Sequence, residues 1–334
     1  MYQEKYHQQD ISRSSFLITG GAGFIGSNIV EYLIHHGAGK VRVLDNLSTG
    51  SIRNIEHFLT HPAFELVEGD IRDFDTCSSA VKGIDYVSHQ AALGSVPRSI
   101  HDPLTSNSVN VSGFLNILVA ARDAGVKKMV YAPSSSTYGD HKGLPKVEDL
   151  IGQPLSPYAV TKYVNELYAG VFSRTYQFHT VGLRYFNVFG PRQNPKGPYA
   201  AVIPLFVQAA LNHTAPVING DGENSRDFTH VENAVQANIK ALFSDIQVHE
   251  VLNIACGERT TLNQLWEYIS QHASVQMAPL YKEERVGDVK HSLADINKAK
   301  QLIDYNPQIS IQQGLASTVR WYKAALQHVE TLIQ

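Results

Sequence analysis

The feature that most constrains the fold is a short apolar run, followed by a glycine-rich turn and then a helical pattern, near the N-terminus. The run covers residues 16–19 and stops at the segment GGAGFIG, residues 20–26. Gly20, Gly23 and Gly26 would allow a tight turn, a close approach of the backbone to a diphosphate and close packing of the helix on the strand. The free N–H groups at the start of such a helix attract an anion. The sequence therefore predicts a strand, turn and helix that bind a dinucleotide.

A carboxylate follows the second predicted strand. Residues 41–44 form this strand, and Asp45 comes next, close to the ~20-residue offset at which an acidic residue binds the adenosine ribose. A carboxylate there would repel a 2′-phosphate, so the sequence favours NAD over NADP. Arg42 points elsewhere by strand alternation, and Arg53 is a weak argument for NADP.

Strand and helix patterns continue to alternate along the first half of the chain. Further strands are predicted at residues 64–68, 86–89 and 128–131, with helical segments between them. This alternation is typical of a doubly wound parallel sheet, whose ligands lie beyond the carboxyl ends of the strands. We therefore expect Asp70 and Ile71 to flank the adenine, Ala91 and Ala92 the diphosphate and ribose, and the serines 134–136 the nicotinamide and the substrate.

A tyrosine and a lysine lie four residues apart in the segment SPYAVTKY, residues 156–163. On a helix, Tyr158 and Lys162 would share one face. A free phenol has a pKa of about 10, so a tyrosine that accepts a proton near neutral pH needs a positive charge beside it. Lys162 can supply that charge. The pattern is short, and it gains weight only from the motifs around it.

The length and composition suit a globular protein with one large domain, or with one medium and one small domain. The chain has 334 residues, of which 43% are hydrophobic and 18% charged. Residues 191–198 are rich in Pro, Gly and Asn and predict an exposed loop between domains. We expect a loose polar extension at residues 1–15, a dinucleotide-binding domain at 16–186, and mainly a second domain at 187–334. Residues 229–256 are expected to return to the first domain.

Several classes of protein are disfavoured by the sequence. The net charge is −3 and there is no Lys/Arg run, so a nucleic-acid partner is not expected. No apolar stretch reaches the ~18 residues of a membrane span, and residues 1–15 are too polar for a signal peptide. We therefore expect a cytoplasmic protein. Cys77 and Cys256 are far apart and the His residues form no ligand motif, so neither a disulfide nor a metal is expected.

An ordered series of motifs then resembles a known family. The motifs TGGAGFIG, LDNLSTG, GDIRD, HQAA, SSSTYGD, PYAVTKY and LRYFNVFGP fall within about residues 16–325. The series is similar to the extended short-chain dehydrogenases/reductases and, within them, to UDP-hexose 4-epimerases, particularly those acting on UDP-N-acetylhexosamines. This resemblance implies an α/β fold with a parallel Rossmann sheet, a smaller α/β C-terminal domain that binds a UDP-sugar, and NAD as the cofactor. It also implies a homodimer. The helical patterns at 104–124 and 158–172 carry more apolar positions than packing on a sheet requires, so we expect them to form the interface.

The resemblance assigns roles to individual residues. Tyr158 becomes the catalytic acid/base, Lys162 its electrostatic partner and a ligand of the nicotinamide ribose, and Ser134 the hydroxyl that bridges the substrate O4 and Tyr158. Ser135 and Ser136 become substrate contacts, and the division of labour among the three serines stays open. The cofactor contacts implied are Gly20, Gly23, Phe24, Ile25, Gly26, Asp45, Asn46, Ser48, Thr49, Gly50, Asp70, Ile71, Gln90, Ala91, Ala92, Asn107, Tyr158, Lys162 and Tyr185.

Substrate contacts are implied in the second half of the chain. A guanidinium can pair two phosphate oxygens at once, and the resemblance gives this task to Arg226 and Arg285, with Asp288 close to Arg285. Ser292 lies seven residues after Arg285, where a small residue would admit a 2-acetamido group. The remaining substrate contacts implied are Asn187, Ala201 and Val202.

The reaction implied is an oxidation and reduction at one carbon. Tyr158 takes the proton of the sugar 4-hydroxyl while C4 gives hydride to NAD, the keto sugar turns over, and hydride returns to its opposite face. A sugar-nucleotide 4,6-dehydratase is disfavoured, because Ser135 and Ser136 stand where its acid/base pair would be. A non-catalytic NAD sensor is disfavoured by the presence of Tyr158, Lys162 and the serines. A 4-epimerase of UDP-hexuronic or UDP-N-acetylhexuronic acid stays open as the alternative.

Overall fold

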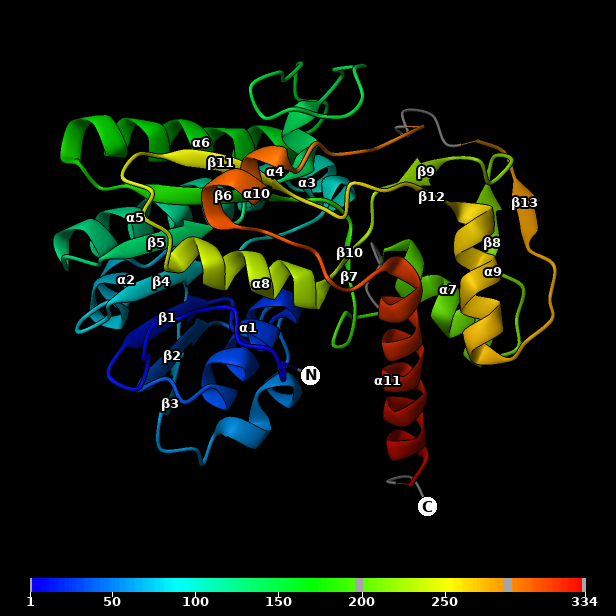
Figure 1. Ribbon diagram of the computed structural model, residues 1–334, viewed down its shortest axis with the longest axis horizontal. Coiled ribbons are helices and arrows are strands. Elements are labelled where there is room, and N and C mark those ends of the chain that lie inside the picture. The colour runs from blue at the N-terminus through cyan, green and yellow to red at the C-terminus, as the bar shows by residue number, and fades with distance from the viewer. Residues whose placement is uncertain (1, 196–200, 285–289, 332–334) are drawn as a thin grey trace.

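The structure, a computed structural model, describes residues 2–195, 201–284 and 290–331. A parallel sheet with helices on both faces forms the larger part, and a smaller lobe of helices and short strands lies beside it (Figure 1). No helix in these ranges is long and apolar enough to cross a membrane.

The large sheet is doubly wound. Seven strands of the described chain pair in the order β11-β6-β5-β4-β1-β2-β3, and every neighbouring pair is parallel. The strand order reverses between β1 and β4, where such sheets bind their ligands. The five strands expected from the sequence are confirmed. The strands are β1 Ser15–Thr19, β2 Lys40–Asp45, β3 Phe64–Glu68, β4 Tyr86–His89, β5 Lys128–Tyr131, β6 Thr180–Tyr185 and β11 Glu250–Ile254.

Helices cover both faces of this sheet. On one face α1 packs on β1 and β2, and α8 packs on β4, β5 and β6; on the other, α5 packs on β4 and α6 on β6 (Figure 1). Because both faces are covered, the central strands β1, β2, β4, β5 and β6 are almost entirely buried. These helices and their connections are α1 Phe24–His35, α2 Phe74–Ala80, α3 Val96–His101, α4 Pro103–Asn107, a π-helical turn Ser108–Gly113, α5 Phe114–Asp123, α6 Pro157–Tyr176 and α8 Val231–Leu242.

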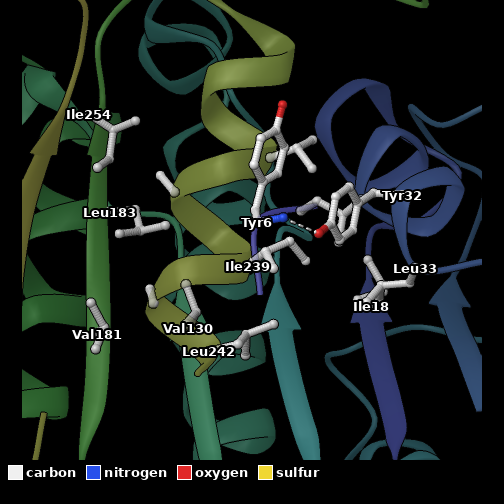
Figure 2. Packing of buried hydrophobic residues seen from close by; sticks show 14 of the residues in the cluster. Tyr6, Ile18, Tyr32, Leu33, Val130, Val181, Leu183, Ile239, Leu242 and Ile254 are labelled. Atoms are coloured by element: carbon white, nitrogen blue, oxygen red, sulfur yellow. Dashed lines mark hydrogen bonds between the residues drawn. The ribbon is translucent and has the colours of Figure 1, made fainter. Parts of the chain in front are cut away.

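The core under α8 joins the two halves of the sheet. Figure 2 shows Ile239 and Leu242 of α8 among Val130, Leu183 and Ile254 of three strands, and all five belong to one buried cluster. Residues 229–256 thus contribute both α8 and the edge strand β11 to the large sheet.

The smaller lobe has its own buried cluster, which includes Phe206, Trp266 and Leu315. Within the described ranges its strands form two-stranded sheets that pair β10 with β7, β12 with β9 and β13 with β8. Its elements are β7 Val188–Phe189, α7 Val202–Leu211, β8 Val217–Asn219, β9 Ser225–Arg226, β10 Thr229–His230, β12 Thr260–Thr261, α9 Leu262–Ala273, β13 Leu280–Lys282 and α11 Ile311–Thr331, and α10 Asn297–Ile303 packs against β11.

The N-terminal segment differs from the expected loose extension. Tyr2, Tyr6 and Ile11 are buried. The Tyr6 ring stacks on Tyr32 of α1 with ring centroids 5.3 Å apart, and the Tyr6 N–H donates to the Tyr32 hydroxyl (Figure 2). The Tyr2 hydroxyl donates to Asn28 of the same helix at 2.8 Å. The expectation of a loose extension was therefore wrong. It rested on the polar composition of the segment as a whole and overlooked its few aromatic and aliphatic residues, which are buried.

Candidate active site

A cavity of about 510 Å³ lies at the carboxyl ends of the strands β1 to β6, next to the point where the strand order reverses. It brings together most of the residues that the sequence analysis singled out. These are Gly20, Gly23, Phe24, Ile25, Gly26, Asp45, Asn46, Ser48, Thr49, Gly50, Asp70, Ile71, Gln90, Ala91, Ala92, Ser134, Tyr158, Lys162, Tyr185, Asn187 and Ala201.

The glycine turn leaves no room for side chains. Gly20 has φ +68°, and a Cβ added to it would lie 2.7 Å from the backbone nitrogen of Ala91. A Cβ on Gly26 would lie 2.2 Å from the carbonyl oxygen of Gly20. In the described chain no side chain caps the start of α1 at Gly23, so its first N–H groups can bind an anion. This turn fits the diphosphate of a dinucleotide.

Asp45 is suited to the adenosine ribose. Its carboxylate accepts the N–H groups of Ala22 at 2.9 Å and Leu47 at 2.8 Å, which fix its position and leave further acceptor sites free. Burial raises the pKa of this carboxyl, and the two hydrogen bonds oppose that shift. Arg53 is exposed and does not line the cavity, and the Arg42 guanidinium pairs with Glu65. Neither arginine is therefore placed to favour NADP.

Tyr158 and Lys162 lie on the first turns of α6 and both face the cavity. The Lys162 ammonium lies 5.9 Å from the centroid of the Tyr158 ring and donates to the carbonyl of Ala132 at 2.8 Å. Burial lowers the pKa of Lys162 to about 8, so the group is mainly charged at neutral pH. Burial also raises the pKa of Tyr158, and a hydrogen bond with Ser134 opposes that rise. The phenolate form of Tyr158 therefore needs stabilisation by neighbouring groups such as Ser134 and Lys162.

The serine cluster supplies one of those partners. Ser134 lines the cavity, and its hydroxyl oxygen accepts hydrogen bonds from the hydroxyl of Ser136 at 2.9 Å and from the Ser136 N–H at 3.2 Å. With its own oxygen so occupied, Ser134 can direct its proton to Tyr158 and stabilise the phenolate. Ser135 and Ser136 lie in the 3₁₀ turn Ser135–Tyr138 and are not among the residues that line the cavity.

The backbone at the start of α6 is held from two sides. The Ala159 N–H donates to the hydroxyl of Ser156 at 3.1 Å, as the predicted helix start would allow. The Tyr158 N–H donates to the hydroxyl of Ser99 of α3 at 3.0 Å. Ser99 was missed by sequence reasoning, because a contact across 59 residues leaves no local signal.

The cofactor contact predicted for Asn107 does not fit the structure. Asn107 is exposed at the end of α4 and does not line the cavity. The buried amide of this stretch is Asn110, which accepts from the N–H of Leu93 at 2.7 Å and donates to Thr161 of α6 at 3.1 Å. Asn110, and not Asn107, therefore links the segment after β4 to α6.

Five predicted substrate contacts do not line the cavity, and two cannot be placed. Val202 begins α7, and Ser135 and Ser136 lie in the 3₁₀ turn described above. The Arg226 guanidinium donates to the carbonyls of Ser225 and Lys290. Ser292 donates its N–H to the carbonyl of Ser225 at 3.0 Å, so Arg226 and Ser292 are held near each other in the smaller lobe. Arg285 and Asp288 lie outside the described residues.

The cavity also includes residues that the sequence analysis did not name. Arg98 of α3 brings a cation to its lining, and Gln193 brings an amide whose buried oxygen has no hydrogen-bond partner within the described chain. Their places in the sequence could have indicated them, since Arg98 follows β4 and Gln193 follows the segment FNVFGP. The further lining residues missed are Leu44, Gly69, Leu93, Gly94, Ser95, Val109, Ala132, Pro133, Val188 and Asn194.

Comparisons with known proteins agree with this geometry. The family model of the NAD dependent epimerase/dehydratase family matches residues 16–255. The chain is 39% identical over 309 residues to a putative UDP-glucose 4-epimerase of Methanocaldococcus jannaschii, covering 92% of this chain and 98% of the relative.

Two solved structures are also similar. One is a UDP-N-acetylglucosamine 4-epimerase from Methanobrevibacter ruminantium in complex with UDP-N-acetylmuramic acid, with 41% identity, a TM-score of 0.89, and 93% of this chain and 99% of that chain covered. The other is a UDP-glucuronic acid 4-epimerase from Bacillus cereus with UDP-glucuronic acid and NAD, with 29% identity, a TM-score of 0.86, and 93% and 99% covered. The glycine turn and Asp45 fit the same cofactor, NAD. The three relatives described above carry the names of UDP-sugar 4-epimerases, and this chain belongs to the NAD dependent epimerase/dehydratase family.

Proposed function

We propose that the protein catalyses the C4 epimerisation of a UDP-N-acetylhexosamine and interconverts UDP-GlcNAc and UDP-GalNAc. The observation that carries this proposal is the convergence of Tyr158, Lys162 and Ser134 in a cavity that also contains the glycine turn and Asp45. Tyr158 can accept a proton, Lys162 provides a cation and Ser134 provides a hydroxyl. We expect these three groups to lie beside the nicotinamide end of a bound NAD.

The chain's own groups would manage the proton of the reaction. NAD, when bound, supplies an acceptor for the hydride of C4 and returns that hydride later. Tyr158 takes the proton of the 4-hydroxyl and gives it back after the sugar has turned over. The Lys162 ammonium stabilises the phenolate, and Ser134 donates a hydrogen bond to it. The smaller lobe would hold the UDP part while the hexose rotates.

The preference for an N-acetylated sugar is supported by small residues. Ala201 and Asn187 both line the cavity, and Gln193 brings to the same lining an amide oxygen that has no hydrogen-bond partner among the described residues. Ser292 does not line the described cavity, but the resemblance implies that a bulky residue at this position closes the sugar pocket of a UDP-hexose epimerase. The similar structure from M. ruminantium is also named a UDP-N-acetylglucosamine 4-epimerase.

The alternative is a 4-epimerase of UDP-hexuronic or UDP-N-acetylhexuronic acid. Arg98 favours it, because a guanidinium in the lining could pair with a C6 carboxylate. The similar structure from B. cereus binds UDP-glucuronic acid.

A substrate panel tests the proposal. UDP-Glc, UDP-GlcNAc, UDP-GlcA and UDP-GlcNAcA are each incubated with the protein, and the stereochemistry at C4 is read by proton NMR. We expect the fastest epimerisation with UDP-GlcNAc. Tyr158→Phe keeps the ring but removes the proton acceptor, so its rate should fall by about 10²- to 10⁴-fold. Faster turnover of a uronic acid would favour the alternative, and an active Tyr158→Phe would contradict the assigned acid/base.

A second experiment tests the wall of the sugar pocket. Ser292→Tyr adds a phenol ring, which is at least as large as an acetamido group, so we expect loss of UDP-GlcNAc turnover with UDP-Glc turnover kept or improved. Ser292→Ala is the control and should keep the wild-type preference, because it adds no bulk. Unchanged discrimination in Ser292→Tyr would mean that this residue does not border the sugar.

A further inference from the structure

A buried hydrogen-bond network lies directly behind the cavity wall. Asn238 of α8 is fully buried and does not itself line the cavity. Its amide donates to the Tyr185 hydroxyl at 2.7 Å and to the carbonyl of Ala234 at 2.8 Å. Its oxygen accepts from the hydroxyl of Ser88 at 3.1 Å and from the amide of Gln90 at 3.1 Å. All four hydrogen-bonding positions of this side chain are therefore occupied.

The backbone of α8 decides the direction of the whole network. The carbonyl of Ala234 can only accept, so the amide nitrogen of Asn238 must face it, and the amide oxygen must face Ser88 and Gln90. Gln90 then has to present its nitrogen to Asn238 and its oxygen to the Tyr185 hydroxyl. That oxygen accepts the proton of the Tyr185 hydroxyl at 3.2 Å.

The two side chains that Asn238 orients are both part of the cavity lining. Gln90 follows β4 and Tyr185 ends β6, so they come from strands on either side of β5. Neither side chain has a choice of orientation while Asn238 is in place, because an inverted Gln90 amide would set donor against donor or acceptor against acceptor. The orientations of Gln90 and Tyr185 in the cavity lining are thus set before any ligand binds.

We infer that Asn238 is a positioning residue, which controls how long the cofactor stays bound by fixing the side chains of Gln90 and Tyr185. Without Asn238, these two side chains can adopt several arrangements, and a bound nucleotide has to order them at a cost in affinity. The inference depends on the cofactor being NAD. It does not depend on which sugar the protein converts, so a failed sugar assignment would leave it standing.

The test measures the release of the cofactor directly. Protein loaded with NADH is mixed with an excess of NAD, and the loss of bound NADH fluorescence gives the dissociation rate. We expect Asn238→Leu to release NADH about 10- to 100-fold faster than the wild type. Should Asn238→Leu not accumulate as folded protein, Asn238→Ala takes its place with the same expectation. Release at the wild-type rate from a folded Asn238 variant would overturn the inference.

Asn233 provides a matched control on the same helix. It is equally buried, but its amide donates to the carbonyl of Ile309 and accepts from the N–H groups of Gln308 and Ile309, away from the cavity. Asn233→Leu should lower the melting temperature as Asn238→Leu does, yet keep NADH release within about 3-fold of the wild type. Equal acceleration in both variants would reduce Asn238 to a general structural role and contradict the inference.

A double-mutant cycle tests the path through Tyr185. Tyr185→Phe removes the hydroxyl that Asn238 and Gln90 share. If Asn238 acts through this side chain, the fold-increase in NADH release of the double variant should be smaller than the product of the fold-increases of the two single variants. Fully multiplicative effects would mean that Asn238 does not act through Tyr185, and the inference would fail.

Discussion

Burial shifts the pKa values of the two central side chains, Tyr158 and Lys162, in opposite directions. It lowers the pKa of Lys162 to about 8 and raises the pKa of Tyr158. Both shifts favour the neutral forms, since desolvation penalises charge. The lysine nevertheless stays mainly protonated at neutral pH, so its charge is available when the tyrosine loses its proton.

This coupling predicts a shifted pH profile for Lys162→Met. Removal of the ammonium raises the pKa of Tyr158 further, so a smaller fraction is phenolate at any given pH. The acid limb of the kcat profile should move up by about one pH unit, and kcat at pH 7 should fall by about 10-fold or more. Lys162→Arg keeps the charge and should shift the limb less. An unchanged profile in Lys162→Met would show that this charge does not stabilise the phenolate.

The place of a residue in the cavity could be predicted where the residue belongs to a sequence motif. It could not be predicted where only the fold brings the residue to the site. Tyr158, Lys162 and Ser134 meet in the cavity as the sequence indicated. Asn107 does not, since it is exposed at the end of α4, and the buried asparagine of this stretch is Asn110, three residues further on in the π-helical turn Ser108–Gly113. Periodicity in the sequence does not reveal such a turn.

The start of α6 is the element on which the orientation of Tyr158 depends. Pro157 has no N–H, and the next two N–H groups are satisfied by Ser99 and Ser156. Two different segments of the chain therefore fix the first turn of this helix.

We expect Ser99→Ala to lower kcat by about 3- to 10-fold with little change in KM, because the loss of a cap worth about 1 kcal/mol lets the first turn of α6 shift. Ser106→Ala is the control, since Ser106 is equally buried but its hydroxyl donates to the carbonyl of Asp102 within its own segment. Steady-state kinetics and melting temperatures compare the two. An equal loss of stability and of kcat in both variants would argue against a special role for the α6 cap.

Elements of the large sheet were easier to predict than those of the smaller lobe. The central strands are four to six residues long and apolar, and each is followed by a distinctive turn. Strands such as β7, β9, β10 and β12 have only two residues, which is too short for any hydrophobic alternation. They depend on partners that are distant in sequence.

At the scale of the whole molecule, the N-terminal segment ties the first helix to the rest. Tyr6 packs on Tyr32 of α1, and its hydroxyl donates to Glu232 of α8. We predict that Tyr6→Ala lowers the free energy of unfolding by about 3 kcal/mol, as loss of a buried ring usually does. Gln9→Ala, at an exposed position, should change it by less than about 0.5 kcal/mol. Denaturant unfolding compares them, and equal stabilities would mean that the segment is not anchored.

The neighbouring helices α4 and α6 expose apolar side chains. Leu104 is 83% exposed, and Leu167 and Val171 of α6 are 51% and 43% exposed. Apolar patches of this kind mark interfaces, and a two-fold pair would bury them against themselves. We expect a homodimer, and we expect Leu167→Arg to be monomeric by light scattering. A stable wild-type monomer at micromolar concentration would contradict this assembly.

The fate of the hydrogen at C4 tests the proposed function most directly. In this account, C4 loses its hydrogen as hydride and regains that same hydrogen on the opposite face, while Tyr158 handles only the hydroxyl proton. UDP-GlcNAc carrying deuterium at C4 should therefore yield UDP-GalNAc that keeps the deuterium in ordinary water, with no H4 signal in the proton NMR spectrum of the product. An H4 signal drawn from the solvent, or no UDP-GalNAc at all, would contradict it.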